Sequence, residues 1–354
     1  MVYFEGVMNF AVTVVTERAV AMKIGFIGAG WMSEMMSQAI IKMHEAGNTK
    51  PELYAVAARS LDRAKAFAER FGFEKAYGSY QELVGDPLVD LIYIAVPHSH
   101  HYETGKLCLE SGKAVLCEKA FTANANEARQ LVSLAKEKGI FLAEAIWTRY
   151  QPMRRILNET IESGVIGDVH LVYANLGKAI SHKDRIRLPE LAGGALLDIG
   201  VYPINFVEMV LGTPSEITAT GTLNALGMDM NDCIHFRYAD GKQAMIAASV
   251  TQCTDSNGMV YGTKGFIRVL NVNNPEGLEI YDKDGKLVKC ISAPEKLTGY
   301  EYEIEECIRM MEDSKLESES MPLSETIQVM ETMDEIRRQL GVSYPFETGD
   351  RSMK

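Results

Sequence analysis

Short apolar runs alternate with stretches of helical periodicity over the first part of the chain. Strands are predicted near residues 23–27, 53–58, 90–96, 114–117 and 141–145. The run LIYIAVP is continuously apolar, which is typical of a strand that is covered on both faces of a parallel sheet. The segment ANEARQLVSLAKEKG has helical spacing and ends with basic residues and Gly139, a helix stop signal. From Lys23 to about Ala145 the pattern therefore predicts βαβ units around a parallel sheet.

The pattern changes after Gly167. Strands are predicted over residues 169–176, 216–222, 234–238, 244–250, 265–270 and 277–281. Turns such as AlaAspGlyLys and LysAspGlyLys separate several of them, which is typical of antiparallel hairpins. Two acidic helices, near 300–313 and 323–340, close the chain. We therefore expect an α/β protein: an N-terminal Rossmann dinucleotide-binding domain over 22–145, then a C-terminal α+β domain over 146–354 with a mostly antiparallel open sheet.

Residues 1–21 precede the first predicted strand. They contain the apolar run FAVTVVT and end in Ala-Val-Ala, which resembles a signal-peptidase site. However, the segment lacks a basic N-terminal region, and Glu5 and Glu17 interrupt it. Met22 stands immediately before the strand at which such domains normally begin. We interpret residues 1–21 as a dispensable extension rather than a secretion signal.

The segment MKIGFIGAGWMS at 22–33 combines a buried strand, a glycine turn and the start of a helix. Gly28 can adopt the left-handed turn, Gly30 allows close approach of phosphates, and the helix N-terminus supplies amide donors. Ser33 replaces the third glycine of the dinucleotide motif but is small enough for close helix–strand packing. Taken alone, the motif also fits an ordinary glycine turn after a buried strand. The candidate cofactor contacts in this segment are Gly28, Ala29, Gly30, Trp31 and Met32.

The end of the second predicted strand bears on which nicotinamide cofactor is used. NAD-binding folds carry an acidic residue there for the ribose hydroxyls, whereas LYAVAA is followed by Arg59 and Ser60, with no acid before Asp62. A guanidinium and a hydroxyl suit a 2′-phosphate, which Arg59 can bind in bidentate fashion. In the alternative, Ser60 only caps the next helix and Arg59 is solvated. The pattern favours NADP(H) over NAD(H), which stays possible.

Composition narrows the class of partner. The chain has 354 residues, 47% of them hydrophobic, and a net charge of −12, which argues against nucleic acid or an anionic membrane as a partner. No apolar run reaches the ~18 residues of a membrane span. Six cysteines are scattered without a CxxC pair, a pattern that suits reduced thiols in the cytoplasm.

The predicted strand at 90–96 leads into ValProHisSerHisHis at 96–101. Three histidines so close together raise the possibility of a metal site, but no Cys or acidic pattern clearly completes one. We therefore expect no metal, and interpret the segment as a loop and helix start beside the nicotinamide. Pro97, His98 and His101 are the candidate cofactor contacts.

Two further segments carry candidate catalytic residues. GKAVLCEKA places Glu118 and Lys119, both candidate cofactor contacts, at the carboxyl end of a strand, where open α/β sheets bind ligands. GGALLDIGVYP places Asp198 and Tyr202 four residues apart on one helical face, and Pro203 puts both near the helix start. A lysine beside a tyrosine favours the phenolate and is expected to lower the tyrosine pKa from about 10. Tyr202 is then a candidate for proton exchange with a substrate oxygen.

Five ordered motifs, IGAGWM, VPHSHH, GKAVLCEKA, EAIWTRYQP and GGALLDIGVYP, resemble the Gfo/Idh/MocA oxidoreductases from Met22 onward. The sequence is most similar to the branch of dimeric dihydrodiol dehydrogenases and NADP-dependent D-xylose dehydrogenases. The resemblance implies a catalytic group of Lys119, Asp198 and Tyr202, with Trp147 and Arg149 near a sugar or diol substrate. It implies hydride exchange between a nicotinamide cofactor and an alcohol or carbonyl carbon.

One position departs from the family motif. Ala120 stands where the proline after the lysine is usual, and that proline often follows a cis peptide bond. A cis bond before a residue other than proline costs about 2.5–4 kcal/mol. The loop is therefore either trans with Lys119 aimed differently, or cis at a functional site.

Two other functions are compatible with this fold: a non-catalytic NADP-binding regulator and an NAD-dependent sugar or inositol dehydrogenase. Both Lys119 and Tyr202 are present, which favours the enzyme. In the second domain, the segments AMIAASVTQC and GFIRVL carry apolar residues on both parities, so one face of the sheet is expected to be apolar and uncovered. We expect a homodimer through that sheet, and the resemblance points the same way.

Overall fold

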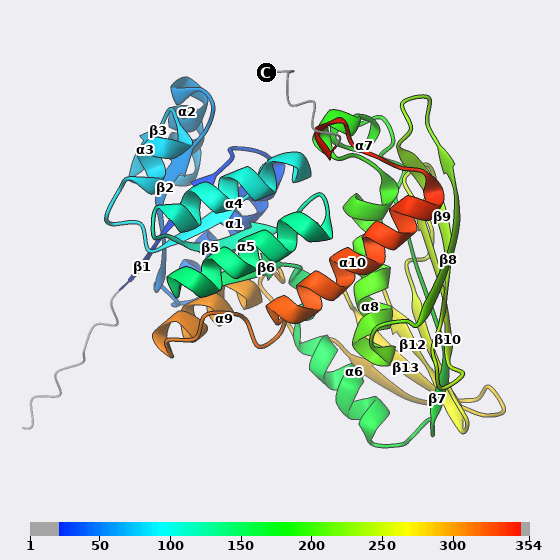
Figure 1. Cartoon of the computed structure of the whole chain (residues 1–354). Helices are drawn as coiled ribbons and strands as arrows, with labels where there is room; N and C mark the ends of the chain where they lie inside the picture. The colour runs from blue at the N-terminus through cyan, green and yellow to red at the C-terminus, as the bar shows by residue number, and fades with distance from the viewer. Residues whose placement is uncertain (1–20, 348–354) are drawn as a thin grey trace, which may run out of the picture.

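A computed structural model describes residues 21–347. The predicted extension therefore lies outside the described residues, except for Ala21. Two sheets with their helices make up the fold (Figure 1). The first sheet has the order β3-β2-β1-β4-β5-β6, with every neighbouring pair parallel, which is the order of a Rossmann domain. Its strands are β1 (Met22–Ile27), β2 (Pro51–Ala57), β3 (Lys75–Tyr77), β4 (Leu91–Ile94), β5 (Ala114–Glu118) and β6 (Leu142–Ala145).

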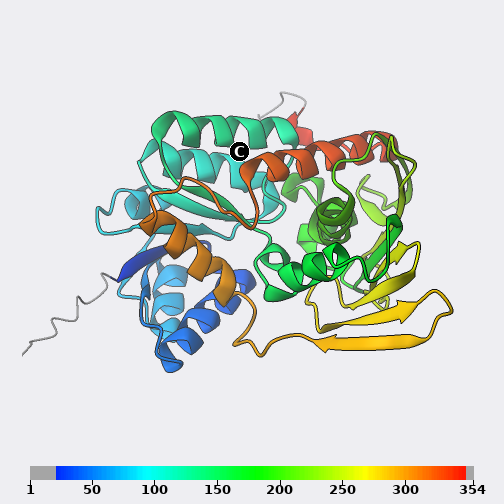
Figure 2. The ribbon, with the colours of Figure 1, turned by 90° about the horizontal axis from the view of Figure 1, so that it is seen from below.

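Helices cover both faces of this sheet. Those contributed by the first part of the chain are α1 (Trp31–Glu45), α2 (Leu61–Phe71), α3 (Tyr80–Val84), α4 (His101–Glu110) and α5 (Ala125–Lys138). A further helix, α9 (Glu301–Glu312), returns from the far end of the chain and lies beside this domain (Figure 2). Ile304, Cys307 and Ile308 of α9 belong to the same buried cluster as Phe26 and Tyr93. The predicted division at residue 145 assigns α9 to the second domain, whereas α9 completes the core of the first.

The second sheet has eight strands in the order β14-β13-β12-β11-β7-β10-β9-β8. All neighbouring pairs are antiparallel except β7 and β10, which confirms the mostly antiparallel sheet. The strands are β7 (Val169–Gly177), β8 (Glu216–Leu223), β9 (Asp229–Arg237), β10 (Gln243–Ser249), β11 (Gly258–Gly262), β12 (Gly265–Leu270), β13 (Gly277–Asp282) and β14 (Leu287–Ser292). Three helices lie on one side of it, α6 (Pro152–Glu162), α8 (Val201–Leu211) and α10 (Leu323–Leu340), and in the described residues no helix lies on the other (Figure 1).

A π-helical turn, Leu196–Gly200, runs directly into α8, and Pro203 is the third residue of that helix. The stretch Pro189–Leu211, which contains both, is long and apolar enough to cross a membrane by composition, contrary to the expectation from apolar runs. In the structure 72% of its 18-residue apolar window is buried inside the protein. The segment is therefore a core element of the second domain, packed between β7 and α10.

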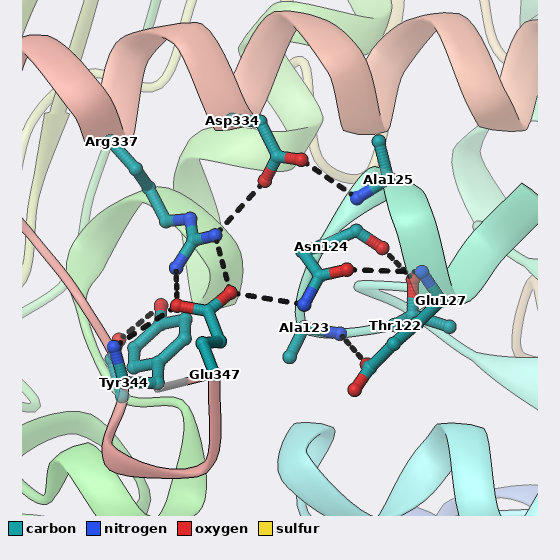
Figure 3. Close-up of polar contacts among 10 residues, drawn as sticks. Thr122, Ala123, Asn124, Ala125, Glu127, Asp334, Arg337, Tyr344 and Glu347 are labelled. Carbon is teal, nitrogen blue, oxygen red and sulfur yellow. Dashed lines mark hydrogen bonds and ion pairs between the residues drawn. The ribbon is translucent and has the colours of Figure 1, made fainter. Parts of the chain in front are cut away.

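A polar network holds α10 against α5 of the first domain (Figure 3). The backbone N–H of Ala125 at the start of α5 donates to Asp334 at 2.8 Å. Asn124, the residue that caps α5, donates to Glu347 at 3.0 Å, and Arg337 of α10 donates to both Glu347 and Asp334. These contacts join the two domains through α5 and α10.

Candidate active site

A cleft of about 430 Å³ lies between the two domains, within the size range of small-molecule sites. Residues from the carboxyl ends of β1, β4 and β5 form one wall, and residues after β7 and at the start of α8 form the other. Ten predicted site residues line this cleft: Gly30, Trp31, Met32, Pro97, His98, Glu118, Lys119, Trp147, Asp198 and Tyr202. Six do not line it: Gly28, Ala29, Arg59, Ser60, His101 and Arg149.

The glycine turn after β1 fits a dinucleotide. Gly28 has φ +107°, and a Cβ there would stand 2.4 Å from the carbonyl oxygen of Ala95, so only glycine is accommodated. Gly30 faces the cleft, and no atom lies within 4 Å of where its Cβ would be. This open space at the N-terminus of α1 suits a pyrophosphate. Ser33 strengthens the turn, because its hydroxyl donates to the carbonyl of Gly28 at 2.7 Å.

Ala29 belongs to the backbone of this turn, and its carbonyl accepts a hydrogen bond from Arg63 at 2.9 Å. Arg59 and Ser60 follow β2 and are exposed. Ser60 precedes α2 in an extended conformation, but its side chain makes no capping hydrogen bond to that helix. The capping role considered for Ser60 is therefore absent, and both side chains face solvent beside the glycine turn.

The three histidines have separate environments. His98 lines the cleft, and its Nδ1 donates to the carbonyl of Ala192 at 3.2 Å, which leaves Nε2 as an acceptor. Burial lowers the pKa of His98 to about 3, so this ring is neutral. His101 is fully buried between the carbonyls of Val96 and Ala120, at 2.8 and 2.9 Å from its ring nitrogens. It therefore supports the loops of the cleft from beneath, rather than lining the cleft as a cofactor contact. Among residues 21–347 no group of three potential metal ligands is found.

Lys119 reaches the other wall of the cleft. Its ammonium donates to the carbonyl of Asp198 at 2.6 Å and lies 3.9 Å from the Asp198 carboxylate. The same nitrogen lies 5.0 Å from the centre of the Tyr202 ring. The peptide bond between Lys119 and Ala120 is cis, which decides between the two loop conformations expected from the sequence.

Asp198 is placed by the π-helical turn. The backbone N–H of Leu196, at the start of that turn, donates to the buried carboxylate of Asp229 at 2.6 Å. Arg185 forms an ion pair with the Asp198 carboxylate from the second-domain wall. Burial alone raises the pKa of Asp198, but the Lys119 and Arg185 cations outweigh it and lower the pKa overall. Asp198 is therefore an ionised acceptor in the cleft.

Tyr202 differs from the expectation. Burial, followed by the nearby Glu118 carboxylate, raises its pKa well above the usual value. The prediction that Lys119 lowers this pKa is wrong, because desolvation and the surrounding acidic groups outweigh the one cation. Tyr202 therefore holds its proton at neutral pH.

Glu118 is a second proton-holding group in the cleft. It is almost fully buried, and the hydroxyl of Tyr93 donates to it. Burial raises the pKa of Glu118 to about 7, against the opposing effects of the Tyr93 hydrogen bond and the Lys119 charge. Its carboxyl group can therefore gain or lose a proton near neutral pH.

Ten residues that line the cleft were not predicted from the sequence, and five of them have polar side chains: Lys178, Lys183, Arg185, Asn273 and Tyr300. Tyr300 stacks on Trp147, with ring centres 4.5 Å apart and planes 14° apart, and the indole N–H faces Asn273 at 3.4 Å. The basic run KAISHKDRIR was a readable signal for the three cations. No local signal marks Tyr300, because only the return of α9 to the first domain brings it to Trp147.

Arg149 lies elsewhere than predicted. Its guanidinium is buried, pairs with Glu325 of α10 and lies 3.3 Å from the sulfur of Met321. It lines a smaller cavity between α6, α8 and β12 that Tyr202 also borders. Arg149 thus lies at this smaller cavity and not at the main cleft.

Comparisons with known proteins agree with this architecture. Residues 22–145 match the model of an oxidoreductase family with an NAD-binding Rossmann fold, and residues 155–268 match the GFO/IDH/MocA C-terminal domain. A trans-1,2-dihydrobenzene-1,2-diol dehydrogenase of Mus musculus is 33% identical over 340 residues, covering 92% of this chain and 98% of that protein. A D-xylose 1-dehydrogenase (NADP(+)) of Hypocrea jecorina is 37% identical over 365 residues, covering 92% and 93%.

Two solved structures share the fold. A levoglucosan dehydrogenase in complex with NADH and levoglucosan is 19% identical, with a TM-score of 0.81, and covers 91% of this chain and 97% of its own. A 3-ketoreductase from Actinomadura kijaniata in complex with NADP and TDP-benzene is 23% identical, with a TM-score of 0.79, and covers 90% and 98%. Taken with the family matches, these findings show that the chain belongs to the Gfo/Idh/MocA oxidoreductases and is an enzyme that uses a nicotinamide cofactor.

Proposed function

We propose that the protein is an NADP(H)-dependent dehydrogenase that interconverts a secondary alcohol of a sugar or diol and the corresponding carbonyl. The observation that carries the proposal is the meeting of Lys119, Asp198 and Tyr202 in the cleft that the glycine turn also lines. Relatives named as D-xylose and dihydrodiol dehydrogenases support the substrate class. Arg59 and Ser60 after β2, and the NADP(+) in the name of the xylose dehydrogenase, support the cofactor preference.

The role of each residue in the reaction follows from its charge. A nicotinamide held at the glycine turn would supply or accept the hydride. Tyr202, which is neutral, donates a proton to the substrate oxygen as the carbonyl is reduced, and recovers it in the reverse direction. Lys119 stabilises negative charge that develops on that oxygen. Asp198 is ionised and accepts hydrogen bonds from substrate hydroxyls. His98 offers a second acceptor through Nε2.

The Tyr202→Phe variant tests this assignment against a panel of aldoses and diols with NADP⁺. Loss of a general acid–base group should lower kcat by 10²- to 10⁴-fold. NADPH binding, measured by fluorescence titration, should stay within about threefold, because Tyr202 is assigned to the substrate. Tyr238→Phe, which removes a hydroxyl bonded to Gly212 outside the cleft, is the matched control. An unchanged kcat in Tyr202→Phe would remove this residue from the mechanism, and tight NADPH binding without any turnover would identify a non-catalytic regulator.

We also propose that two copies pair through the uncovered face of the second sheet. Leu171, Tyr261, Phe266 and Tyr281 are cross-strand partners in one row over β7, β11, β12 and β13. Phe266 stacks on Tyr281 with ring centres 4.6 Å apart. In the neighbouring row, Met245 is 47% exposed. An apolar row of this kind on an open sheet is typical of an interface, and a two-fold dimer is the commonest arrangement.

We also propose that the protein is cytoplasmic and that it has no nucleic-acid or membrane partner. All six cysteines are free and three of them are exposed, which suits a reducing compartment. The net charge of −12 disfavours binding to polyanionic surfaces. Fractionation of cells that express the tagged full chain is the direct test of the location.

A further inference from the structure

The cleft holds more positive charge than the catalytic group uses. Four cations line it, Lys119, Lys178, Lys183 and Arg185, against two carboxylates. Lys119 and Arg185 both face Asp198. Within residues 21–347, neither Lys178 nor Lys183 has an ion-pair partner. The cleft of a chain with a net charge of −12 is therefore locally cationic.

The positive charges of these four residues repel one another. Burial lowers the pKa of Lys178, and Lys119, Arg185 and Lys183 lower it further, while Asp198 opposes them. Like charges gathered at one site raise its free energy unless a ligand supplies the opposite charge. Glu118 is only partly ionised at neutral pH, because its pKa is about 7, so it does not balance the two unpaired lysines.

Lys178 and Lys183, the two cleft lysines without an ion pair in the described residues, lie in a different domain from the glycine turn at Gly28 and Gly30. Lys178 directly follows β7, and Lys183 directly precedes the short helix α7 (Asp184–Arg187), both on the second-domain wall. The turn that suits the phosphates of a dinucleotide, at Gly28 and Gly30, belongs to the first domain. The segment with the free lysines also carries Arg185, which holds Asp198. An anion bound there would lie on the substrate side of the cleft.

We propose that Lys178 and Lys183 form an anion subsite, so that the preferred substrate is a sugar or polyol that carries a carboxylate or a phosphate. This inference rests on the proposed function and names the substrate class of the same site. The two ammonium groups bind the acidic group as point charges, while Arg185 stays paired with Asp198. The reacting hydroxyl is thereby fixed at a set distance from its acidic end.

Matched substrate pairs test the subsite. D-glucuronate differs from D-xylose by a carboxylate on C5, and D-glucose 6-phosphate differs from D-glucose by a phosphate. With NADP⁺, wild-type kcat/KM should be at least tenfold higher for one acid than for its neutral partner. In Lys178→Met/Lys183→Met this ratio should fall at least tenfold, mostly through KM. Lys136→Met/Lys138→Met, two exposed lysines at the end of α5, makes the same change in net charge and should leave the ratio unaltered.

Binding measurements show whether Lys178 and Lys183 bind the acidic group of the substrate or a phosphate of the cofactor. Calorimetry of each acid against the protein saturated with NADP⁺ should show binding that the Lys178→Met/Lys183→Met variant loses. If that variant instead weakens NADPH binding tenfold and leaves the acid-to-neutral ratio unchanged, the subsite belongs to the cofactor and the inference is overturned. Turnover of neutral sugars without preference for the acids overturns the inference and leaves the proposed function standing. Acid binding that depends on the two lysines, without turnover of any substrate, overturns the proposed function and leaves only the anion subsite, not the substrate class, standing.

Discussion

The charge on Asp198 depends on two cations that reach it from different domains. Lys119 comes from the end of β5, and Arg185 comes from the segment that follows β7. The place of Lys119 was predictable because it follows a strand of the parallel sheet, and the family resemblance supplied its grouping with Asp198 and Tyr202. The protonation state of Tyr202 was not predictable from the sequence. It depends on burial and on Glu118, and both are set by how the two domains meet.

Arg59 is the residue that we expect to select NADP(H) over NAD(H). It is exposed beside the glycine turn, where no acidic residue stands between the end of β2 and Asp62. Because a guanidinium binds a phosphate in bidentate fashion, Arg59→Ala should weaken NADP(H) binding at least tenfold and change NAD(H) binding by less than threefold. Fluorescence titration of both reduced cofactors measures this. Arg70→Ala on α2, which removes an ion pair with Glu34, is the control. Equal weakening of both cofactors would show that Arg59 does not contact a 2′-phosphate.

At the scale of elements, strongly periodic segments were predictable and weakly patterned ones were not. The predicted helix over 323–340 matches α10 in both bounds. Three strands were not predicted: β3, β11 and β14. β3 has three half-buried residues, and β14 is an edge strand whose residues are almost all exposed, so neither shows an alternation of apolar and polar positions. β11 begins and ends with a glycine, and only its pairing with β7 and β12 makes it a strand.

The contact between α8 and α10 carries a prediction about pH. Glu208 of α8 is buried and accepts a hydrogen bond from the Thr332 hydroxyl of α10 at 2.6 Å. Burial raises the pKa of Glu208 from 4.5 to about 7, although the Thr332 hydrogen bond opposes the shift. Between these values the unfolded chain has lost the proton that the folded protein keeps. The free energy of unfolding therefore falls as pH rises from about 4.5 to 7.

Glu208→Gln removes this titration while keeping the shape of the side chain. Relative to wild type, its free energy of unfolding should rise between pH 4.5 and 8 by on the order of 3 kcal/mol, at about 1.4 kcal/mol per pKa unit. Urea unfolding at several pH values measures the difference. Glu137→Gln, an exposed position on α5, should shift stability equally at every pH. A difference between Glu208→Gln and wild type that stays constant with pH would show that Glu208 is ionised in the folded protein.

At the scale of the whole molecule, the chain crosses between its domains more often than its sequence suggests. α9 completes the core of the first domain, and its approach brings Tyr300 to Trp147 in the cleft. α10 then returns to the second domain and is tied to α5 through Asp334. The two-domain division was readable from the change in periodicity. The crossings of α9 and α10 between the domains were not predictable, because no local sequence pattern indicates which sheet an amphipathic helix near the C-terminus will cover.

The uncovered sheet face yields the prediction on assembly. If the aromatic row over β11, β12 and β13 is an interface, light scattering should give about 79 kDa, twice the chain mass of 39.3 kDa. Phe266→Glu places a charge in the middle of that row, between Tyr261 and Tyr281, and burying an unpaired charge at an interface costs several kcal/mol. The variant should therefore shift towards 39.3 kDa at micromolar concentration while its circular dichroism is unchanged. Leu226→Glu, which adds the same charge at an exposed residue between β8 and β9, should stay dimeric. A wild-type protein that is monomeric under these conditions would overturn the proposed dimer.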